Sequence, residues 1–168
     1  EECKAVRERV GVLELSSFQL ETTESLNARA AVVLNISEDH MDRYQSLQHY
    51  ADTKARVFNG TGAMVLNRDD PLVMAMATQG RDQIRFGLQL PEREDDYGVK
   101  EIDGKTWLVH GQELLIAAEE IRVPGKHNIG NVLAAMALAN VLGVPVEAAR
   151  RAIKGFTGLP HRCQLVAE

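Results

Sequence analysis

The sequence predicts an α/β fold, with a mostly parallel, doubly wound sheet, flanking helices and a small antiparallel β flap. Short apolar runs rich in β-branched residues alternate with amphipathic segments as far as Pro91. After Pro91 the chain changes to short alternating segments separated by Asp103-Gly104 and Gly111-Gln112, which are hairpin turn signals. With 168 residues, 45% of them hydrophobic, the chain is long enough for one substantial core. A single domain is therefore the default expectation.

Four apolar runs are candidates for the main strands. Residues 10–15 and 30–36 are continuous and rich in β-branched side chains, as expected of strands buried on both faces of a parallel sheet. Residues 62–66 and 83–86 give a weaker signal of the same kind. Later in the chain, the pattern predicts flap strands at residues 97–102, 106–110 and 113–116, and a further strand at residues 163–166.

Four segments have the apolar periodicity of helices. The repeat runs through residues 46–58 and, most strongly, through residues 127–142. Residues 70–78 place Pro71 in the first helical turn, a favourable position for proline. Residues 146–154 form a helical segment behind a proline. Alternation of such helices with strands predicts the doubly wound arrangement.

Composition argues against several classes of protein. The formal net charge is −5 and charged residues make up 26% of the chain, which suits neither a disordered segment nor a nucleic-acid partner. No apolar stretch reaches the ~20 residues of a membrane-spanning helix, and the first nine residues carry no apolar secretory segment. Cys3 and Cys163 lack metal-type spacing. We expect a cytoplasmic monomer with free thiols, acting on small-molecule substrates without nucleic acid or membrane.

Polar clusters accompany the first two predicted strands. Glu14 stands beside the end of the first, and the run Glu38-Asp39-His40 follows the second. Because the ligand crevice of an open parallel sheet lies beyond the carboxyl ends of its strands, both clusters are expected to face one cleft. Carboxylates with an imidazole suit a divalent metal bound together with phosphate oxygens. The alternative is that Ser37 and Asp39 only cap the next turn.

Lys54 interrupts an otherwise apolar helical stripe in residues 46–58. The apolar or aromatic members of the stripe are Leu47, Tyr50, Ala51, Val57 and Phe58. An ammonium group that points inward is costly unless it has a partner. Either the stem packs while the charged head reaches water, or the charge is removed chemically.

Two further groups lie near predicted helix ends and breaks. Asn128 and Asn131 share one face of the first turn of the helix at residues 127–142. Their amides suit the edge of a ligand ring, or they satisfy the free N–H groups of the helix start. Arg162 follows Gly158-Leu159-Pro160-His161, where a guanidinium would clamp a phosphate or a carboxylate, or remain solvated.

Four stretches together resemble the ATP-dependent Mur ligases, and within that family the members that add D-glutamate. They read Leu-Glu-Leu-Ser-Ser-Phe-Gln-Leu at residues 13–20, Asn-Ile-Ser-Glu-Asp-His-Met-Asp-Arg-Tyr at 35–44, Gly-Lys-His-Asn-Ile-Gly-Asn at 125–131, and Gly-Leu-Pro-His-Arg at 158–162. The resemblance runs over nearly the whole chain in the family's order. The first two stretches are specific in combination, because sister ligases carry different residues around the equivalent Glu and His.

The resemblance implies an ATP- and Mg²⁺-dependent ligase of peptidoglycan precursor synthesis. Such an enzyme joins D-glutamate to UDP-N-acetylmuramoyl-L-alanine through an acyl-phosphate intermediate. The resemblance also implies residue roles: Glu14 and His40 as magnesium ligands, Lys54 as a carbamylated lysine that holds magnesium or its water, Ser16, Gln19 and His40 near the muramoyl substrate, Asn128 and Asn131 at the adenine, and Arg162 near the nucleotide phosphates.

One family motif does not occur in the sequence. The glycine-rich phosphate loop of the Gly-Lys-Ser/Thr type, which in the family precedes the Leu-Glu-Leu-Ser-Ser stretch, does not precede it here, and Gly125-Lys126-His127 lacks the hydroxyl that follows the lysine. We therefore expect residues 1–159 to be part of the central ATP-binding domain, residues 160–168 to begin the C-terminal ligase domain, and the chain alone to be catalytically incomplete.

Two alternatives remain beside this interpretation. One is another ATP-dependent amide ligase of the superfamily, similar to folylpolyglutamate synthetase, against which Ser16-Ser17-Phe18-Gln19 argues. The other is a non-catalytic α/β module, which the missing phosphate loop would permit. Glu14, His40, Lys54 and Arg162 together favour an enzyme, because each has little use without a ligand.

Overall fold

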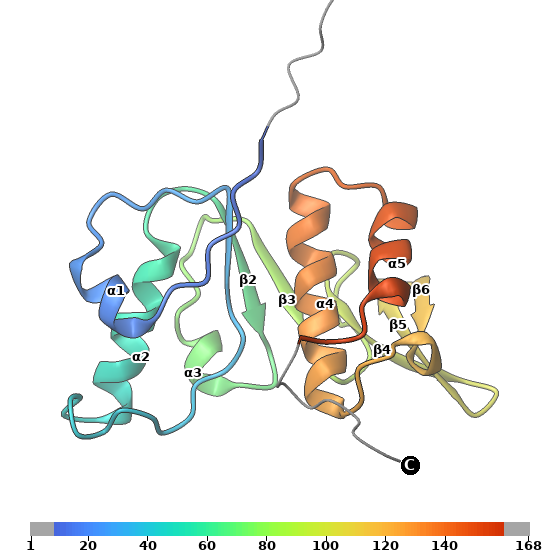
Figure 1. The fold of residues 1–168 in the computed structure, drawn as a ribbon, viewed down its shortest axis with the longest axis horizontal. Coiled ribbons are helices and arrows are strands. Elements are labelled where there is room, and N and C mark those ends of the chain that lie inside the picture. Colours follow the sequence, from blue (N-terminus) through green and yellow to red (C-terminus); the bar gives the residue numbers. More distant parts are fainter. Residues whose placement is uncertain (1–8, 160–168) are drawn as a thin grey trace, which may run out of the picture.

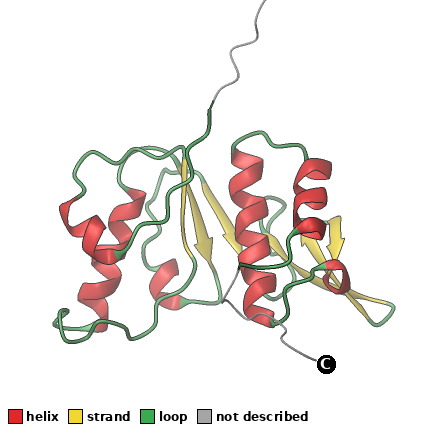
Figure 2. Ribbon diagram, in the orientation of Figure 1, coloured by secondary structure: helices red, strands yellow, loops and turns green. Residues whose placement is uncertain are grey.

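The computed structural model describes residues 9–159, and within this range the strands form one mixed sheet of six (Figures 1 and 2). The strands follow one another across the sheet in chain order. They are β1 (Ala30–Val33), β2 (Ala63–Asn67), β3 (Gln83–Phe86), β4 (Tyr97–Ile102), β5 (Lys105–His110) and β6 (Glu113–Ala117). The pairs from β1 to β4 are parallel, and β4, β5 and β6 pair antiparallel. The predicted α/β class with its flap is confirmed.

The flap is specified by its turns. Asp103 and Gly104, between β4 and β5, both have positive φ values of 51° and 75°, as a two-residue hairpin of the primed type requires. Gly111 takes φ 54° between β5 and β6. Pairing of Ile102 with Lys105 fixes the register of the first hairpin.

Helices cover both faces of the parallel part of the sheet (Figure 1). On one face lie α4 (Lys126–Val141) and, beside it, α5 (Val146–Gly155). On the other face, α3 (Pro71–Met74) and the 3₁₀ turn η1 (Arg56–Phe58) pack against the sheet, and α2 (Leu47–Ala55) with α1 (Ser17–Thr22) lies outside them. A short 3₁₀ turn, η2 (Ala118–Glu120), follows β6. No helix in the range 9–159 is both long enough and apolar enough to cross a membrane.

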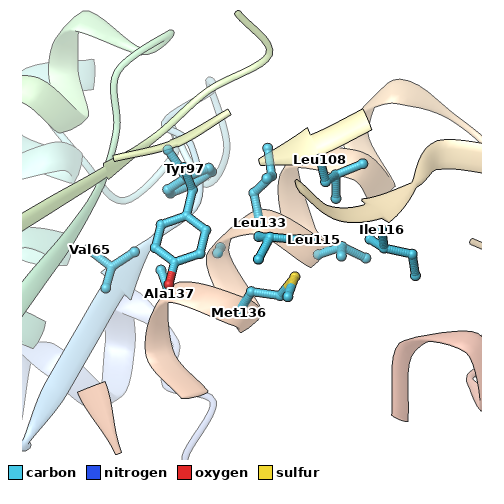
Figure 3. Packing of buried hydrophobic residues seen from close by; sticks show 11 residues of the cluster. Val65, Tyr97, Leu108, Leu115, Ile116, Leu133, Met136 and Ala137 are labelled. Carbon is cyan, nitrogen blue, oxygen red and sulfur yellow. The ribbon is translucent and has the colours of Figure 1, made fainter. Parts of the chain in front are cut away.

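Each face of the sheet has its own core. Toward α4, Val65 of β2 and the flap residues Leu108 and Leu115 pack with Leu133 and Met136 (Figure 3). Alternate residues of β2 point the other way, where Met64 and Leu66 join Phe58 and Val73. This alternation, with both sets fully buried, is the structural counterpart of the continuous apolar run in the sequence.

Residues 10–15 were wrongly predicted to form a strand. The structure assigns no regular element to them, and Val12 is 87% exposed. A strand needs a neighbour for its backbone N–H and C=O groups, and no strand in the described part of the chain pairs with this segment. Apolar composition alone does not indicate whether a segment has such a neighbour.

Other boundaries are close to those predicted. The strand predicted at residues 30–36 ends at Val33, and the helix predicted at residues 70–78 is the shorter α3, which Asp70 caps through hydrogen bonds from the N–H groups of Leu72 and Val73. Helix α1 was not predicted from the sequence. The strand predicted at residues 163–166 lies outside the described residues.

Candidate functional site

A pocket of about 180 Å³ lies at the carboxyl edge of the parallel strands. It is lined by Leu34, Asn35, Asn67, Asp69, Phe86, Gly87, Leu88, Lys126, His127, Gly130 and Asn131. These residues come from the ends of β1, β2 and β3 and from the first turns of α4. The edge beyond the carboxyl ends is where open parallel sheets bind ligands. Pockets for drug-sized ligands measure ~300–1,000 Å³, so this one is smaller than a site for a whole ligand of that size.

Side chains at the end of β2 and just beyond it link the ends of three strands through hydrogen bonds around the pocket. Asn67 donates its Nδ2–H to the Leu34 carbonyl at 2.8 Å, and its Oδ1 accepts from the Asp69 N–H at 2.9 Å. Asp69 in turn accepts from the Leu88 N–H through Oδ2 at 2.6 Å. A Cβ at Gly87 would lie 2.7 Å from the Arg68 side chain and 2.8 Å from Asp69 Oδ1, so a larger residue there would displace these groups. The pocket wall is thus fixed by polar contacts from three strand ends.

The start of α4 supplies the opposite wall. Gly125 is its N-cap residue, with φ 103° and no side-chain cap. The Asn128 side chain donates to the Pro124 carbonyl at 2.7 Å and accepts from Asn131 Nδ2 at 3.2 Å. Neither amide caps a free N–H of the helix, so the capping alternative is not what the structure contains. Asn131 lines the pocket, while Asn128 orients it from outside.

His40 lies in a turn between β1 and α2, with φ 53°. Left-handed backbone is uncommon outside glycine and concentrates at functional sites. Asp39 accepts from the His40 N–H at 2.9 Å through Oδ1, and its Oδ2 lies 3.4 Å from His40 Nε2. The Phe18 ring packs against the imidazole with centroids 4.8 Å apart. The imidazole is exposed and available to a ligand.

Ser16 and Gln19 form the capping box of α1. Gln19 donates its backbone N–H to Ser16 Oγ at 3.2 Å, and its side chain accepts from the Ser16 N–H at 2.8 Å. Ser16 Oγ also lies 3.1 Å from Gln19 Oε1. This pairing accounts for the residue types at that spacing, and a role toward the substrate stays a prediction.

Lys54 lies on α2 as the stripe predicts. Tyr50, Ala51 and Phe58 of the stripe are buried, and Lys54 itself is half-buried. Its Nζ lies 5.2 Å from the centre of the Tyr50 ring, which faces the ammonium with its electron-rich π system. The aliphatic stem therefore packs inward while the charged head is held over an aromatic face.

The residues predicted to bind metal lie on three separate segments. Glu14 is exposed ahead of α1, His40 is in the turn after β1, and Lys54 is on α2. Within residues 9–159 no three His, Cys, Asp or Glu side chains converge on a common point. Magnesium at phosphate sites usually takes only one or two carboxylates from the protein and fills the rest with phosphate and water. Exposed Glu14 fits that mode, whereas an amine at Lys54 does not ligate magnesium unless it is converted to an anion.

Sequence reasoning missed two parts of this edge. Asn67 is the last residue of β2 and Asp69 lies two positions beyond it, so the signal used for the polar run after β1 would have found them. The second part is a contact between α1 and the His40 turn: Glu21 accepts hydrogen bonds from Arg43 and Tyr44. These residues are more than 20 positions apart, and no local pattern links them. Arg162 lies outside the described residues.

A larger cavity, of about 600 Å³, lies at the opposite edge of the sheet, beside the starts of β2 and β3. Its charged lining residues are Arg81, Asp82, Arg93 and Asp95. Arg81 is already engaged there, donating to the carbonyls of Phe58 and Gly62. None of the predicted site residues within the described range lines this cavity, whereas Asn131 lines the smaller pocket. We therefore place the candidate site at the smaller pocket.

Comparison with known proteins identifies the family to which this fold belongs. Residues 2–139 match the family model of the Mur ligase middle domain. The chain is 52% identical over 158 residues to UDP-N-acetylmuramoylalanine–D-glutamate ligase of Aromatoleum aromaticum, covering 94% of this chain and 34% of that protein. It is 51% identical over 157 residues to the ligase of the same name from Nitrosococcus oceani, with the same coverage. The chain thus spans about a third of the length of these relatives.

Solved structures give the same fold. MurF from Acinetobacter baumannii superposes with a TM-score of 0.67 over 83% of this chain and 32% of that one, at 21% sequence identity. At this identity the likeness concerns the fold alone. Since the family model covers most of the sequence, the chain belongs to the Mur ligase family, and residues 2–139 correspond to its middle domain.

Proposed function

We propose that this chain is the nucleotide-binding part of a cytoplasmic ligase that joins D-glutamate to UDP-N-acetylmuramoyl-L-alanine. The observation that carries the proposal is 52% identity over 94% of the chain to a ligase of that name. The matching stretches include the polar segments at the carboxyl edge of the sheet, where a pocket lies. The reaction class is the ATP-dependent formation of an amide from a carboxylate and an amine.

The pocket is proposed to take the adenine side of ATP. Asn131 presents an amide group that can pair with donors and acceptors on a ring edge, whereas the Asn67 amide is engaged by the Leu34 carbonyl and the Asp69 N–H and shapes the wall. Asn128 holds the Asn131 amide in one orientation through the 3.2 Å contact. The N-terminus of α4 with Lys126 favours an anion close by. Arg162 is proposed to bind the nucleotide phosphates.

Activation of the substrate carboxylate is assigned to the segments around His40. ATP and magnesium, when bound, supply the phosphoryl group and the positive charge that stabilises its transfer. Glu14 and His40 are proposed to hold magnesium. A carbamate on Lys54 would add an anion from α2, which a half-buried amine over Tyr50 does not provide. Ser16, Gln19 and His40 are proposed to orient the muramoyl substrate. The D-glutamate amine then attacks the acyl phosphate, which forms the amide bond and releases inorganic phosphate.

The test is substrate-dependent turnover by the full-length protein. Phosphate release from ATP should require magnesium, UDP-N-acetylmuramoyl-L-alanine and D-glutamate together, and the product should contain one new amide bond. L-Alanine and meso-diaminopimelate serve as competing amino acids, and a folate with L-glutamate serves as the competing substrate pair. Preference for any of these competitors would overturn the assigned reaction. ATP binding without turnover would favour the non-catalytic module.

A further inference from the structure

The turn that carries His40 is closed by two backbone hydrogen bonds. The N–H groups of Arg43 and Tyr44 donate to the His40 carbonyl at 2.9 and 3.2 Å. His40 itself is left-handed, with φ 53°. A histidine keeps that conformation only where the surrounding structure over-determines it. The side chains of Arg43 and Tyr44 therefore matter, because they hold the two residues that close the turn.

Both of these side chains end on the same carboxylate of α1. Glu21 accepts from Arg43 Nε at 3.1 Å and also from Arg43 Nη2, and it accepts from the Tyr44 hydroxyl at 2.7 Å. Tyr44 is buried, with 4% of its surface exposed, and its ring lies 5.1 Å from that of Tyr50 on α2. Glu21 thus joins a surface arginine and a buried phenol through one carboxylate.

The same face of α1 also touches His40 directly. Phe18 precedes Glu21 by three residues, so the two side chains lie on one side of the helix. The Phe18 ring contacts the His40 imidazole at 4.8 Å and the Arg43 guanidinium at 5.1 Å. Displacement of Arg43 would therefore remove a neighbour of Phe18 as well as a closing residue of the turn.

The geometry points to Glu21 as a positioning residue that acts on His40 through Arg43 and Tyr44. By holding both residues that close the turn, the carboxylate keeps the His40 backbone in its left-handed conformation and its imidazole beside Phe18. Because α1 begins at the capping box of Ser16 and Gln19, the same contact fixes the distance between that box and His40. The expected loss of turnover rests on the function proposed above. The expected change in the position of the His40 imidazole does not.

A purely structural role for Glu21 makes a different prediction. If Glu21 only docked α1, its loss would lower stability and leave the surviving folded protein with a normal His40. A positioning role changes His40 in protein that is still folded. It should also lower kcat while leaving KM for ATP unchanged, since Glu21, Arg43 and Tyr44 are not among the residues lining the nucleotide pocket.

The experiment compares Glu21→Gln with Glu24→Gln in the full-length protein. Glu24 is an exposed carboxylate nearby that makes no side-chain hydrogen bond or ion pair in the described structure, so its replacement removes the same charge without touching the turn. With ¹³C-labelled histidine imidazoles, the His40 signal is assigned by its loss in His40→Gln. The signal should carry the ring-current shift of Phe18 in wild type and Glu24→Gln, and should move toward that of a free histidine in Glu21→Gln. Far-UV circular dichroism confirms that each variant is folded.

Turnover gives the second readout. In Glu21→Gln, kcat should fall about tenfold to a hundredfold, as expected when a reacting group is misplaced by about 1 Å, with KM for ATP within about twofold of wild type. Phe18→Leu, which keeps an apolar side chain but removes the ring, should reproduce the loss of kcat. An unchanged His40 signal, or normal kcat in folded Glu21→Gln, would overturn the positioning role. A shifted signal in a protein whose wild type has no ligase activity would instead refute the proposed function and leave the positioning role standing.

Discussion

Lys54 and Tyr50 lie one helical turn apart on α2, with the ammonium nitrogen 5.2 Å from the centre of the phenol ring. The contact gives the amine a favourable neighbour while it remains a cation. A carbamate in the same place would reverse the sign of the charge and lose that interaction. The ring is therefore suited to the unmodified side chain, and modification would need magnesium or another cation nearby to stabilise it.

Replacing Lys54 by Ala in the full-length protein should lower kcat by about three orders of magnitude, comparable to loss of a charged group from a transition-state site, and leave the fold intact. If the working group is a carbamate, a short carboxylic acid added to Lys54→Ala should restore part of the rate. Lys54→Arg is the matched control, because it keeps a cation over Tyr50 but cannot form the carbamate. Full activity in Lys54→Arg would show that carbamylation is not required.

Replacing His40 by Ala should lower the rate of acyl-phosphate formation about a hundredfold with little effect on ATP binding. The pocket at the α4 N-terminus contains no part of the His40 turn, so nucleotide affinity should not depend on the imidazole. Single-turnover phosphate release measures the first effect, and equilibrium titration with a non-hydrolysable nucleotide measures the second. Near-normal turnover would withdraw the proposed metal role of His40.

The 168-residue chain on its own should show no magnesium-dependent ATP hydrolysis. The single Gly-Lys-Thr of the sequence, Gly104-Lys105-Thr106, lies at the tight β4–β5 hairpin and has Val99 where a phosphate loop needs its first glycine, so no such loop holds the β- and γ-phosphates. The measurement is phosphate release from a pure sample, with a full-length relative as the positive control. Sustained turnover that depends on magnesium would contradict the expectation.

The contact between Glu21 and Arg43 should make stability depend on pH in acid. Hydrogen bonds from Arg43 and then Tyr44 lower the pKa of Glu21 from 4.5 to about 2. Since the folded value is below the unfolded value, the stabilisation is complete above about pH 4.5 and is lost as the pH falls toward 2. The difference in unfolding midpoint between wild type and Glu21→Gln should therefore be constant near neutrality and shrink below pH 4.5. A difference that did not change with pH would show that the carboxylate charge is not what Arg43 binds.

Local signals predicted the parts of the fold that local chemistry specifies. Asp103-Gly104 encodes a hairpin because both residues tolerate positive φ, and the stripe around Lys54 places that residue because helical spacing is fixed. The spacing of Ser16 and Gln19 also matched a capping box, which would have revealed α1 had it been weighed against the strand predicted before it.

Contacts between distant segments could not be predicted in the same way. Residues 10–15 have strand-like composition, yet whether they pair depends on a neighbour that composition does not name. Similarly, nothing near Glu21 indicates that Arg43 and Tyr44 will meet it, because the turn that brings them there is set by the packing of α1 on α2. The candidate site residues were predicted from motifs, whereas the contacts among their neighbours came only from the structure.

The order of the strands has a consequence for how the chain folds. Each described strand pairs with the next one along the chain, so the sheet contains no pairing that skips a strand. The flap β4 to β6 is closed by tight turns and is expected to assemble first, since its loop-closure entropy is small. The parallel pairs β1 to β2 and β2 to β3 must wait for their crossover segments. Refolding kinetics should therefore show early protection of flap amides from hydrogen exchange and late protection in β1.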